Sequence, residues 1–249
     1  MNKPYVRLDR DNAAVLLVDH QAGLLSLVRD IDPDRFKNNV LALADAAKYF
    51  KLPTILTTSF ENGPNGPLMP ELKAMFPDSP YIARPGQINA WDNEDFVQAV
   101  QATGKKQLII AGVVTEVCVA FVALAAIEAG FEVFIVADAS GTFNEMTRDA
   151  AWQRMAAAGA HFMTWFGVAC ELHRDWRNDV EGLECPRREC TTYETRIAQI
   201  GPRWAPRRRQ PRSRLVRRRD PYRADPPGRA RRLGEGCAAA RAARHRSRP

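Results

Sequence analysis

Two reactive side chains stand at the ends of short apolar segments. Cys118 closes the segment Ala111–Cys118, AGVVTEVC, in which a strand-like run passes into a helix-like run. Asp19 directly follows the apolar run Ala14–Val18. A thiol becomes a nucleophile when a neighbouring base takes its proton, and an aspartate can be that base. If the fold brings the two together, the pattern predicts nucleophilic attack on a carbonyl group.

Each of these residues by itself also fits a structural role. A lone cysteine in an apolar helix is commonly buried in a core, which is how we interpret Cys170. An aspartate after a strand commonly caps the next turn. The five cysteines are an odd number and form no CxxC pair. They therefore indicate a reducing compartment and not a disulfide framework or a zinc site.

The elements that must position these residues alternate along the chain. Short segments that are apolar on both faces, separated by helices, are typical of a parallel sheet covered on both sides. We predict an α/β fold with three layers, built on a doubly wound, mainly parallel six-stranded sheet with strand order 3-2-1-4-5-6. The predicted strands are 14–18, 53–58, 81–83, 107–111, 132–137 and 160–164, and the predicted helices are 32–49, 71–76, 92–103, 116–129, 147–158 and 168–176.

The predicted topology places the two reactive residues at one crevice. In such a sheet, ligands bind beyond the carboxyl ends of the strands where the strand order reverses, here between strands 1 and 4. Asp19 ends the first strand, and Cys118 lies in the first turn of the helix after the fourth. The free N–H groups of a first helical turn favour a thiolate. Those of Val114 and Cys118 are candidates for an oxyanion hole.

Three segments resemble the isochorismatase-like cysteine hydrolases. AGVVTEVC resembles their Gly-hydrophobic-x-Thr-(Asp/Glu)-x-Cys signature. AVLLVDH at 14–20, with Gln21, is similar to their opening strand, catalytic Asp and following Gln. Asp138-Ala139-Ser140 is similar to the end of their fifth strand. The resemblance covers about residues 11–183 and is greatest to the bacterial YcaC-like branch.

The resemblance implies a catalytic triad of Asp, Lys and Cys, with a cis peptide bond after the family glycine. Asp19 and Cys118 match two members of the triad, and the cis bond falls between Val113 and Val114. Asn89-Ala90-Trp91 is similar to the family's Ser-Ala-Phe, and this places Arg84 where the lysine is expected.

An arginine in that position changes the expected chemistry. Because its guanidinium stays charged, Arg84 cannot shuttle a proton. It can hold Asp19 ionised, stabilise a thiolate and bind an anionic substrate or transition state. The alternative is a surface arginine beside the Pro85-Gly86 turn. Further candidates for the substrate pocket are Gln21, Phe60, Asn89, Trp91 and Phe143.

The leading hypothesis is a cofactor-independent cysteine hydrolase that cleaves a small amide or related C–N bond through a thioester. Nicotinamidase-like relatives carry an Asp-x-His cluster after the second strand, but residues 57–61 read TTSFE, so neither a metal nor a cofactor is expected. Two alternatives stay open. One is an isochorismatase-type vinyl-ether hydrolase that uses Asp19. The other is a catalytically weak, oligomeric binding or assembly protein.

The charge of the chain divides sharply after Leu183. Residues 184–249 hold 20 of the 36 basic residues, all arginine, and 6 of the 29 acidic ones. This leaves residues 1–183 at −7 although the whole chain carries +7. We interpret 1–183 as the hydrolase domain and 184–249 as a disordered tail whose composition suggests a frameshift or a junction. A basic arm that binds nucleic acid is the alternative, but aromatic residues that could stack on bases are sparse there.

The remaining expectations concern partners and location. The longest uncharged apolar stretch, 117–127, is about half of a membrane span, and no signal peptide is evident. We therefore expect a cytoplasmic protein that contacts no membrane. The resemblance implies a small-molecule substrate and a homo-oligomer.

Overall fold

A computed structural model describes residues 5–179, and these fold around one six-stranded sheet. The strand order is β3-β2-β1-β4-β5-β6, and all five neighbouring pairs are parallel. The predicted fold class and strand order are therefore confirmed, and the sheet is entirely parallel. The strands are β1 (Ala13–Val18), β2 (Thr54–Ser59), β3 (Tyr81–Arg84), β4 (Gln107–Gly112), β5 (Glu132–Val136) and β6 (His161–Met163).

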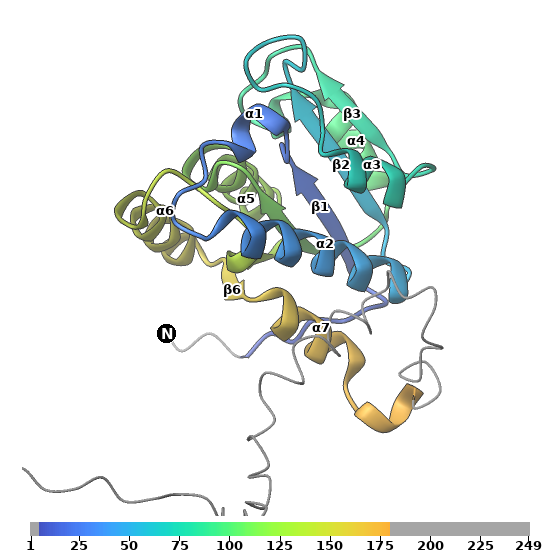
Figure 1. Ribbon diagram of the computed structural model, residues 1–249. Helices are drawn as coiled ribbons and strands as arrows, with labels where there is room; N and C mark the ends of the chain where they lie inside the picture. Colours follow the sequence, from blue (N-terminus) through green and yellow to red (C-terminus); the bar gives the residue numbers. More distant parts are fainter. Residues whose placement is uncertain (1–4, 180–249) are drawn as a thin grey trace, which may run out of the picture. The chain divides into compact units, whose positions relative to one another are not determined.

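Helices cover both faces of this sheet and form the outer two layers (Figure 1). One face packs against α2, α3 and α7, and the other packs against α4, α5 and α6. The helices are α1 (Ala22–Leu25), α2 (Pro33–Tyr49), α3 (Pro70–Met75), α4 (Glu94–Ala102), α5 (Ala120–Glu128), α6 (Glu145–Ala158) and α7 (Trp165–His173). Short turns of other helix types are η1 (Ala90–Asp92), η2 (Thr115–Val119), η3 (Ala137–Ala139) and η4 (Trp176–Asp179).

Strand β1 carries no polar residue because both of its faces are buried. Successive side chains of a strand point to opposite faces of the sheet, and both faces are covered here. Ala13, Val15 and Leu17 belong to the core under α2 and α7, whereas the alternate residues belong to the core under α4 and α5. Every residue of β1 is fully buried. The polar chemistry is therefore confined to the residues beyond the end of the strand.

Side-chain caps move the helix boundaries from those that apolar spacing predicts. The side chain of Asn144 accepts from the N–H of Thr147, so α6 begins at Glu145 and not at 147. Thr164 likewise accepts from the N–H of Gly167 and starts α7 three residues earlier than predicted. The short helix α1 was not predicted. The predicted helix 116–129 is divided into the π-helical turn η2 and the α-helix α5.

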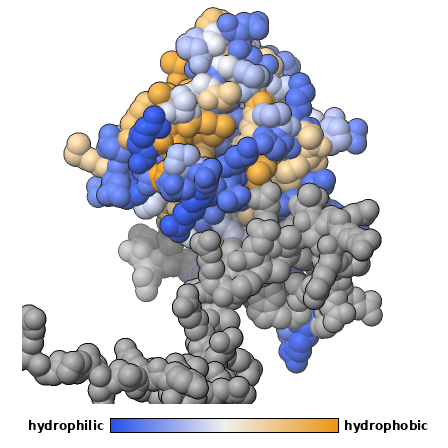
Figure 2. All heavy atoms as spheres, in the orientation of Figure 1, coloured by the Kyte–Doolittle hydropathy of each residue, from blue (hydrophilic) through white to orange (hydrophobic). Residues whose placement is uncertain are grey.

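The surface of the described residues mixes hydrophilic and hydrophobic areas (Figure 2). Among residues 5–179, no helix combines the length and the apolar character that crossing a membrane requires. The tail 184–249, with its predicted disorder and its alternative role as a basic arm, lies outside the described residues. The boundary of the hydrolase domain at 183 therefore stays a prediction.

Candidate active site

Asp19 begins the site directly beyond the carboxyl end of β1. Its φ of 57° lies in the left-handed region, where a residue other than glycine is uncommon and is found preferentially at functional sites. Its N–H donates to the carbonyl of Thr57 at 2.9 Å, and its carbonyl accepts from the N–H of Gln21 at 2.7 Å. Asp19 is fully buried, so its carboxylate is fixed by the protein and not by water.

Arg84, the last residue of β3, supplies the cation of the site. Its Nη2 forms an ion pair with Oδ1 of Asp19, and both side chains are almost completely inaccessible to solvent. Its Nε donates to Oγ1 of Thr57 at 3.0 Å. Its Nη1 donates to the carbonyl of Gln87 and, at 3.4 Å, to that of Ile88. The structure thus places Arg84 in the core of the site, not on the surface.

The two oxygens of the Asp19 carboxylate have different surroundings. Oδ1 is paired with Arg84, whereas Oδ2 is buried and receives no N–H or O–H from any described residue. The thiol of Cys118, a weak donor, interacts with this carboxylate. Burial raises the pKa of Asp19 above its ordinary value, and the guanidinium of Arg84 opposes that rise. The carboxylate is therefore a stronger base than a solvated aspartate.

Cys118 lies opposite Asp19, in the π-helical turn η2 that leads from β4 into α5. The register of the sheet pairs Val18 with Gly112, so Asp19 and the segment that carries Cys118 leave neighbouring strands at the same level. The side chain of Cys118 is buried, and the N–H of Val114 is directed to its sulfur. The peptide bond between Val113 and Val114 is cis, at the position that the family resemblance implied.

The resting state of Cys118 differs from the expectation drawn from helix position. Burial raises the pKa of the thiol well above its ordinary value, and the nearby carboxylate of Asp19 raises it further. The N–H of Val114 and the charge of Arg84 oppose this rise but are smaller influences. The start of a helix was expected to favour a thiolate. The structure instead gives a neutral thiol beside a buried base, so the proton must leave as the sulfur attacks.

Three of the candidate pocket residues are engaged in local structure. The side-chain amide of Gln21 bonds both the N–H and the carbonyl of Ser59 and also the carbonyl of Gly66, so it fixes the loop after β2. Asn89 caps η1 by accepting from the N–H of Trp91 at 3.1 Å. The indole of Trp91 packs edge-on against two phenylalanine rings, those of Phe96 and Phe131.

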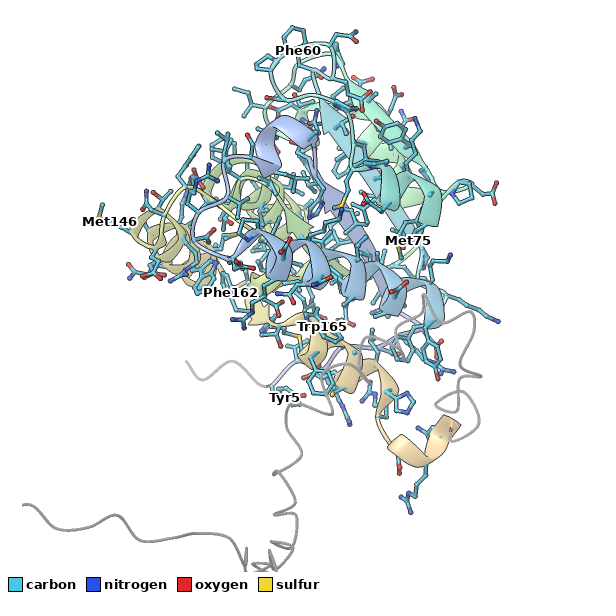
Figure 3. The ribbon with its side chains drawn as sticks, in the orientation of Figure 1. Tyr5, Phe60, Met75, Met146, Phe162 and Trp165 are labelled. Atoms are coloured by element: carbon cyan, nitrogen blue, oxygen red, sulfur yellow. The ribbon has the colours of Figure 1, made fainter. Side chains whose placement is uncertain are left out.

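The other two candidates are exposed on loops that follow strands. Phe60 is 52% exposed and lies beyond the carboxyl end of β2, where Figure 3 labels it. Phe143 is 44% exposed and lies on the loop between η3 and α6. The structure thus brings Asp19, Arg84, Val114 and Cys118 together. It leaves the two phenylalanines as side chains that an approaching ligand could contact.

Sequence analysis missed two residues that hold this site. Thr57 contacts both members of the ion pair, through its carbonyl and its hydroxyl. Thr142 donates its hydroxyl to Glu116 in η2, two residues from the nucleophile. The signal for Thr57 was the pair of threonines in the strand segment PTILTT, because a buried hydroxyl needs a polar partner. No comparable signal pointed to Thr142.

The sequence predicts no metal site, and the positions of the acidic, cysteine and histidine side chains bear on that prediction. Within residues 5–179, no group of three or more His, Cys, Asp or Glu side chains could hold a metal ion. His20, which follows Asp19, is fully buried with Nε2 3.2 Å from the carbonyl of Ala139. Burial lowers the pKa of His20 to about 4, so its ring is neutral at neutral pH.

The fold and the site together define a class of protein. A doubly wound sheet that presents an Asp, a cation and a Cys at the strand 1/strand 4 crevice is the arrangement that the resemblance to the isochorismatase-like hydrolases implied. The Isochorismatase domain model matches residues 13–166, so the chain belongs to this family.

Particular relatives narrow the position within the family. Probable hydrolase YcaC of Escherichia coli strain K12 is 82% identical over 183 residues, which are 74% of this chain and 88% of that protein. The E. coli YcaC crystal structure, described as an octameric hydrolase of unknown specificity, matches with a TM-score of 0.72 over 73% of this chain and 89% of that one. YcaC from Pseudomonas aeruginosa, described with hexane-2,5-diol and covalent acrylamide, is 76% identical with a TM-score of 0.72 over 73% and 90% of the two chains. The chain is a close homologue of YcaC.

Proposed function

We propose that this protein is a hydrolase that cleaves a small amide or related C–N bond through a thioester on Cys118. The observation that carries the proposal is the buried pair formed by the Asp19 carboxylate and the Cys118 thiol, with the N–H of Val114 directed to the sulfur. The relatives support the hydrolase class, since the E. coli homologue carries the name of a probable hydrolase. Acrylamide is itself a small amide, and its covalent presence in the P. aeruginosa homologue suits a nucleophilic thiol.

The first half-reaction follows from the positions of these groups. Asp19 accepts the proton of Cys118 while Sγ forms a bond to the substrate carbonyl carbon. The oxyanion is held by the N–H groups of Val114 and Cys118. The tetrahedral adduct then collapses, the C–N bond breaks, and Asp19 returns its proton to the departing nitrogen. The product of this half-reaction is an acyl group bound to Sγ as a thioester.

The second half-reaction repeats the same proton transfers with water. Asp19 takes a proton from the water that attacks the thioester carbonyl, and the C–S bond breaks to release the carboxylic acid. Sγ regains a proton from Asp19, which restores the resting pair. Arg84 remains a cation throughout, because a guanidinium does not deprotonate in proteins. Its role is to orient Asp19 and to stabilise negative charge near the reacting atoms.

A panel of small amides tests the proposal. We expect the wild-type protein to release ammonia or amine from at least one member and the Cys118→Ala variant to release none. Rapid quenching followed by intact mass analysis should show an added acyl mass on the wild type alone. A Cys118→Ala variant that is folded and still active would contradict the mechanism. Its fold is checked by circular dichroism and thermal unfolding.

One observation favours a second candidate reaction. Because burial raises the pKa of Asp19, its protonated form could donate a proton to the vinyl ether of isochorismate without using the thiol. The Cys118→Ala variant separates the two reactions. Isochorismate cleavage that survives this substitution but is lost in Asp19→Asn would favour the vinyl-ether hydrolase.

Assembly is proposed from the same relatives. The E. coli homologue is described as octameric, and a chain 82% identical to it is expected to form a homo-oligomer as well. Multi-angle light scattering of the purified full chain would measure its mass in solution.

A further inference from the structure

We propose that the hydroxyl of Thr57 is the positioning group that allows an arginine to serve as the cation of this site. The proposal goes beyond the residues assigned above and rests on the proposed function, in which Asp19 takes the proton of Cys118. Thr57 lies in β2, between the strands that carry the other two residues: Val18 of β1 pairs with Thr57, and Thr57 pairs with Ile82 of β3. Its strand therefore lies between the strand that ends before Asp19 and the strand that carries Arg84.

Two polar groups of Thr57, its carbonyl and its hydroxyl, bond the ion pair or the residues that support it. Its carbonyl accepts from the N–H of Asp19 at 2.9 Å, which fixes the backbone of the acid. Its hydroxyl accepts from Nε of Arg84 at 3.0 Å and donates to the carbonyl of Ile82 at 2.8 Å. Only a hydroxyl can accept and donate at one point, so the proton that it gives to Ile82 leaves a lone pair aimed at Nε.

This bond determines the direction in which the guanidinium points. With Nε held by Thr57, the two terminal nitrogens have different partners. Nη2 pairs with Asp19, and Nη1 donates to the carbonyls of Gln87 and Ile88. The planar guanidinium has donors at fixed angles, so anchoring Nε fixes the other two. Thr57 is fully buried, and without its hydroxyl the Nε–H would be left in the core with no partner.

The bond is specific to arginine. A lysine carries its only donors on the terminal Nζ and has nothing at the position of Nε. A lysine at position 84 would place a carbon where Nε stands, so its Nζ could bond Thr57 only by moving away from Asp19. The hydroxyl of Thr57 and the guanidinium of Arg84 are thus coupled, and a double-mutant cycle measures that coupling.

The experiment measures alkylation of Cys118 by acrylamide from about pH 5 to about pH 10, with the modified peptide quantified by mass spectrometry. This readout needs no substrate. It follows the proton transfer from the thiol to Asp19, which depends on where Arg84 is held. The variants are Thr57→Val, Thr57→Ser, Arg84→Lys and the double variant Thr57→Val with Arg84→Lys. Thr58→Val is the matched control, since Thr58 is the adjacent buried threonine, points to the opposite face and bonds the hydroxyl of Tyr81.

We expect Thr57→Val to slow alkylation at neutral pH about tenfold and to move the acid limb of the profile to higher pH by about one unit. Both effects follow because a loosened guanidinium stabilises the Asp19 carboxylate and the thiolate less. Thr57→Ser, which keeps the hydroxyl, and Thr58→Val should stay within about twofold of the wild type. In the Arg84→Lys background, Thr57→Val should change the rate less than about twofold.

Several outcomes would overturn the proposal. A purely packing role predicts the reverse order, since valine keeps the shape of threonine and serine does not. An unshifted profile for Thr57→Val, or the same loss in both backgrounds, would therefore reject the coupling. If Thr57→Val does not fold, the double variant decides: it should fold because no Nε–H is left unpaired, and its failure to fold would reject the proposal. Failure of the proposed hydrolase is separate, because an inactive amide panel leaves the alkylation cycle readable.

Discussion

The two sides of the catalytic crevice are built in opposite ways. The acid–cation side, formed by Asp19, Thr57 and Arg84, is a dense network in which all three guanidinium nitrogens and Oδ1 of Asp19 have partners. The thiol side, formed by Val114 and Cys118, is packed among apolar residues of the two cores, and besides Asp19 the sulfur has the N–H of Val114 as its polar neighbour. One side is fixed by hydrogen bonds, and the other is fixed by packing.

This difference shows where the proton can move. A guanidinium that is always charged can neither accept nor give a proton. The proton acceptor on the acid–cation side is therefore the carboxylate of Asp19, whose Oδ2 receives no hydrogen bond from the described residues. The thiol is neutral at rest because its surroundings stabilise a thiolate poorly. Proton transfer between Sγ and the carboxylate of Asp19 is therefore the step that both sides support. Substitutions that disrupt one side at a time test this division.

Removing the charge of Asp19 should have the largest effect. Asp19→Asn keeps the shape of the side chain but leaves Arg84 as a buried cation without its counter-charge. We expect turnover to fall on the order of 10³-fold, because the proposed base is lost. The free energy of unfolding should fall by about 3–5 kcal/mol. Steady-state kinetics and urea unfolding measure the two effects, and an active, fully stable variant would contradict the assignment.

Removing the cation should be nearly as costly for stability but should respond to pH. Arg84→Met leaves Asp19 buried and unpaired, at a cost of about 3–5 kcal/mol at neutral pH. Burial without a cation raises the pKa of the folded Asp19 above that of the unfolded chain. The destabilisation is then present above the folded pKa and is relieved as the pH falls through it. Urea unfolding at several pH values should show this recovery, and a cost that does not vary with pH would contradict it.

His20, which follows Asp19 in the chain, should make the free energy of unfolding depend on pH in the acid range. Because burial lowers the pKa of His20 to about 4 from 6.5, the unfolded chain binds a proton in this range that the folded protein excludes. Stability should therefore fall as the pH drops from 6.5 to about 4, by about 3 kcal/mol in all, and this loss should not grow below that pH. His20→Gln, which keeps a donor for the carbonyl of Ala139, should flatten this part of the curve. Equal slopes for the two proteins would contradict the prediction.

The smallest effect is expected on the thiol side. The hydroxyl of Thr142 donates to Glu116 and ties η2 to the loop after β5, while its N–H donates to Asp30 at 2.8 Å. Thr142→Val should lower the free energy of unfolding by about 1–2 kcal/mol and change Cys118 alkylation less than about twofold. Glu116→Gln keeps an acceptor for the hydroxyl and should cost less. A large loss of alkylation in Thr142→Val would show that hydrogen bonds also fix the thiol side.

Particular elements show how far sequence reasoning reached. The strand order and the crevice between β1 and β4 followed from alternating apolar runs, because buried parallel strands leave little room for other patterns. The starts of α6 and α7 were missed because side-chain caps, not apolar spacing, set them. The π-helical turn at Thr115–Val119 was missed because it continues directly into α5, so the two were predicted as one helix.

The sequence by itself determined which residue types stand at the crevice: an acid after strand 1 and a thiol after strand 4, with an arginine at the position where the family resemblance implies a lysine. The tertiary structure decided how they are connected. It placed Thr57 between the acid and the cation, buried Oδ2 of Asp19 without a conventional donor and left the thiol neutral. The physical reason is that burial and hydrogen-bond direction depend on residues far apart in the sequence. The pKa and the reactivity of Cys118 therefore belong to the assembled crevice and not to its motif.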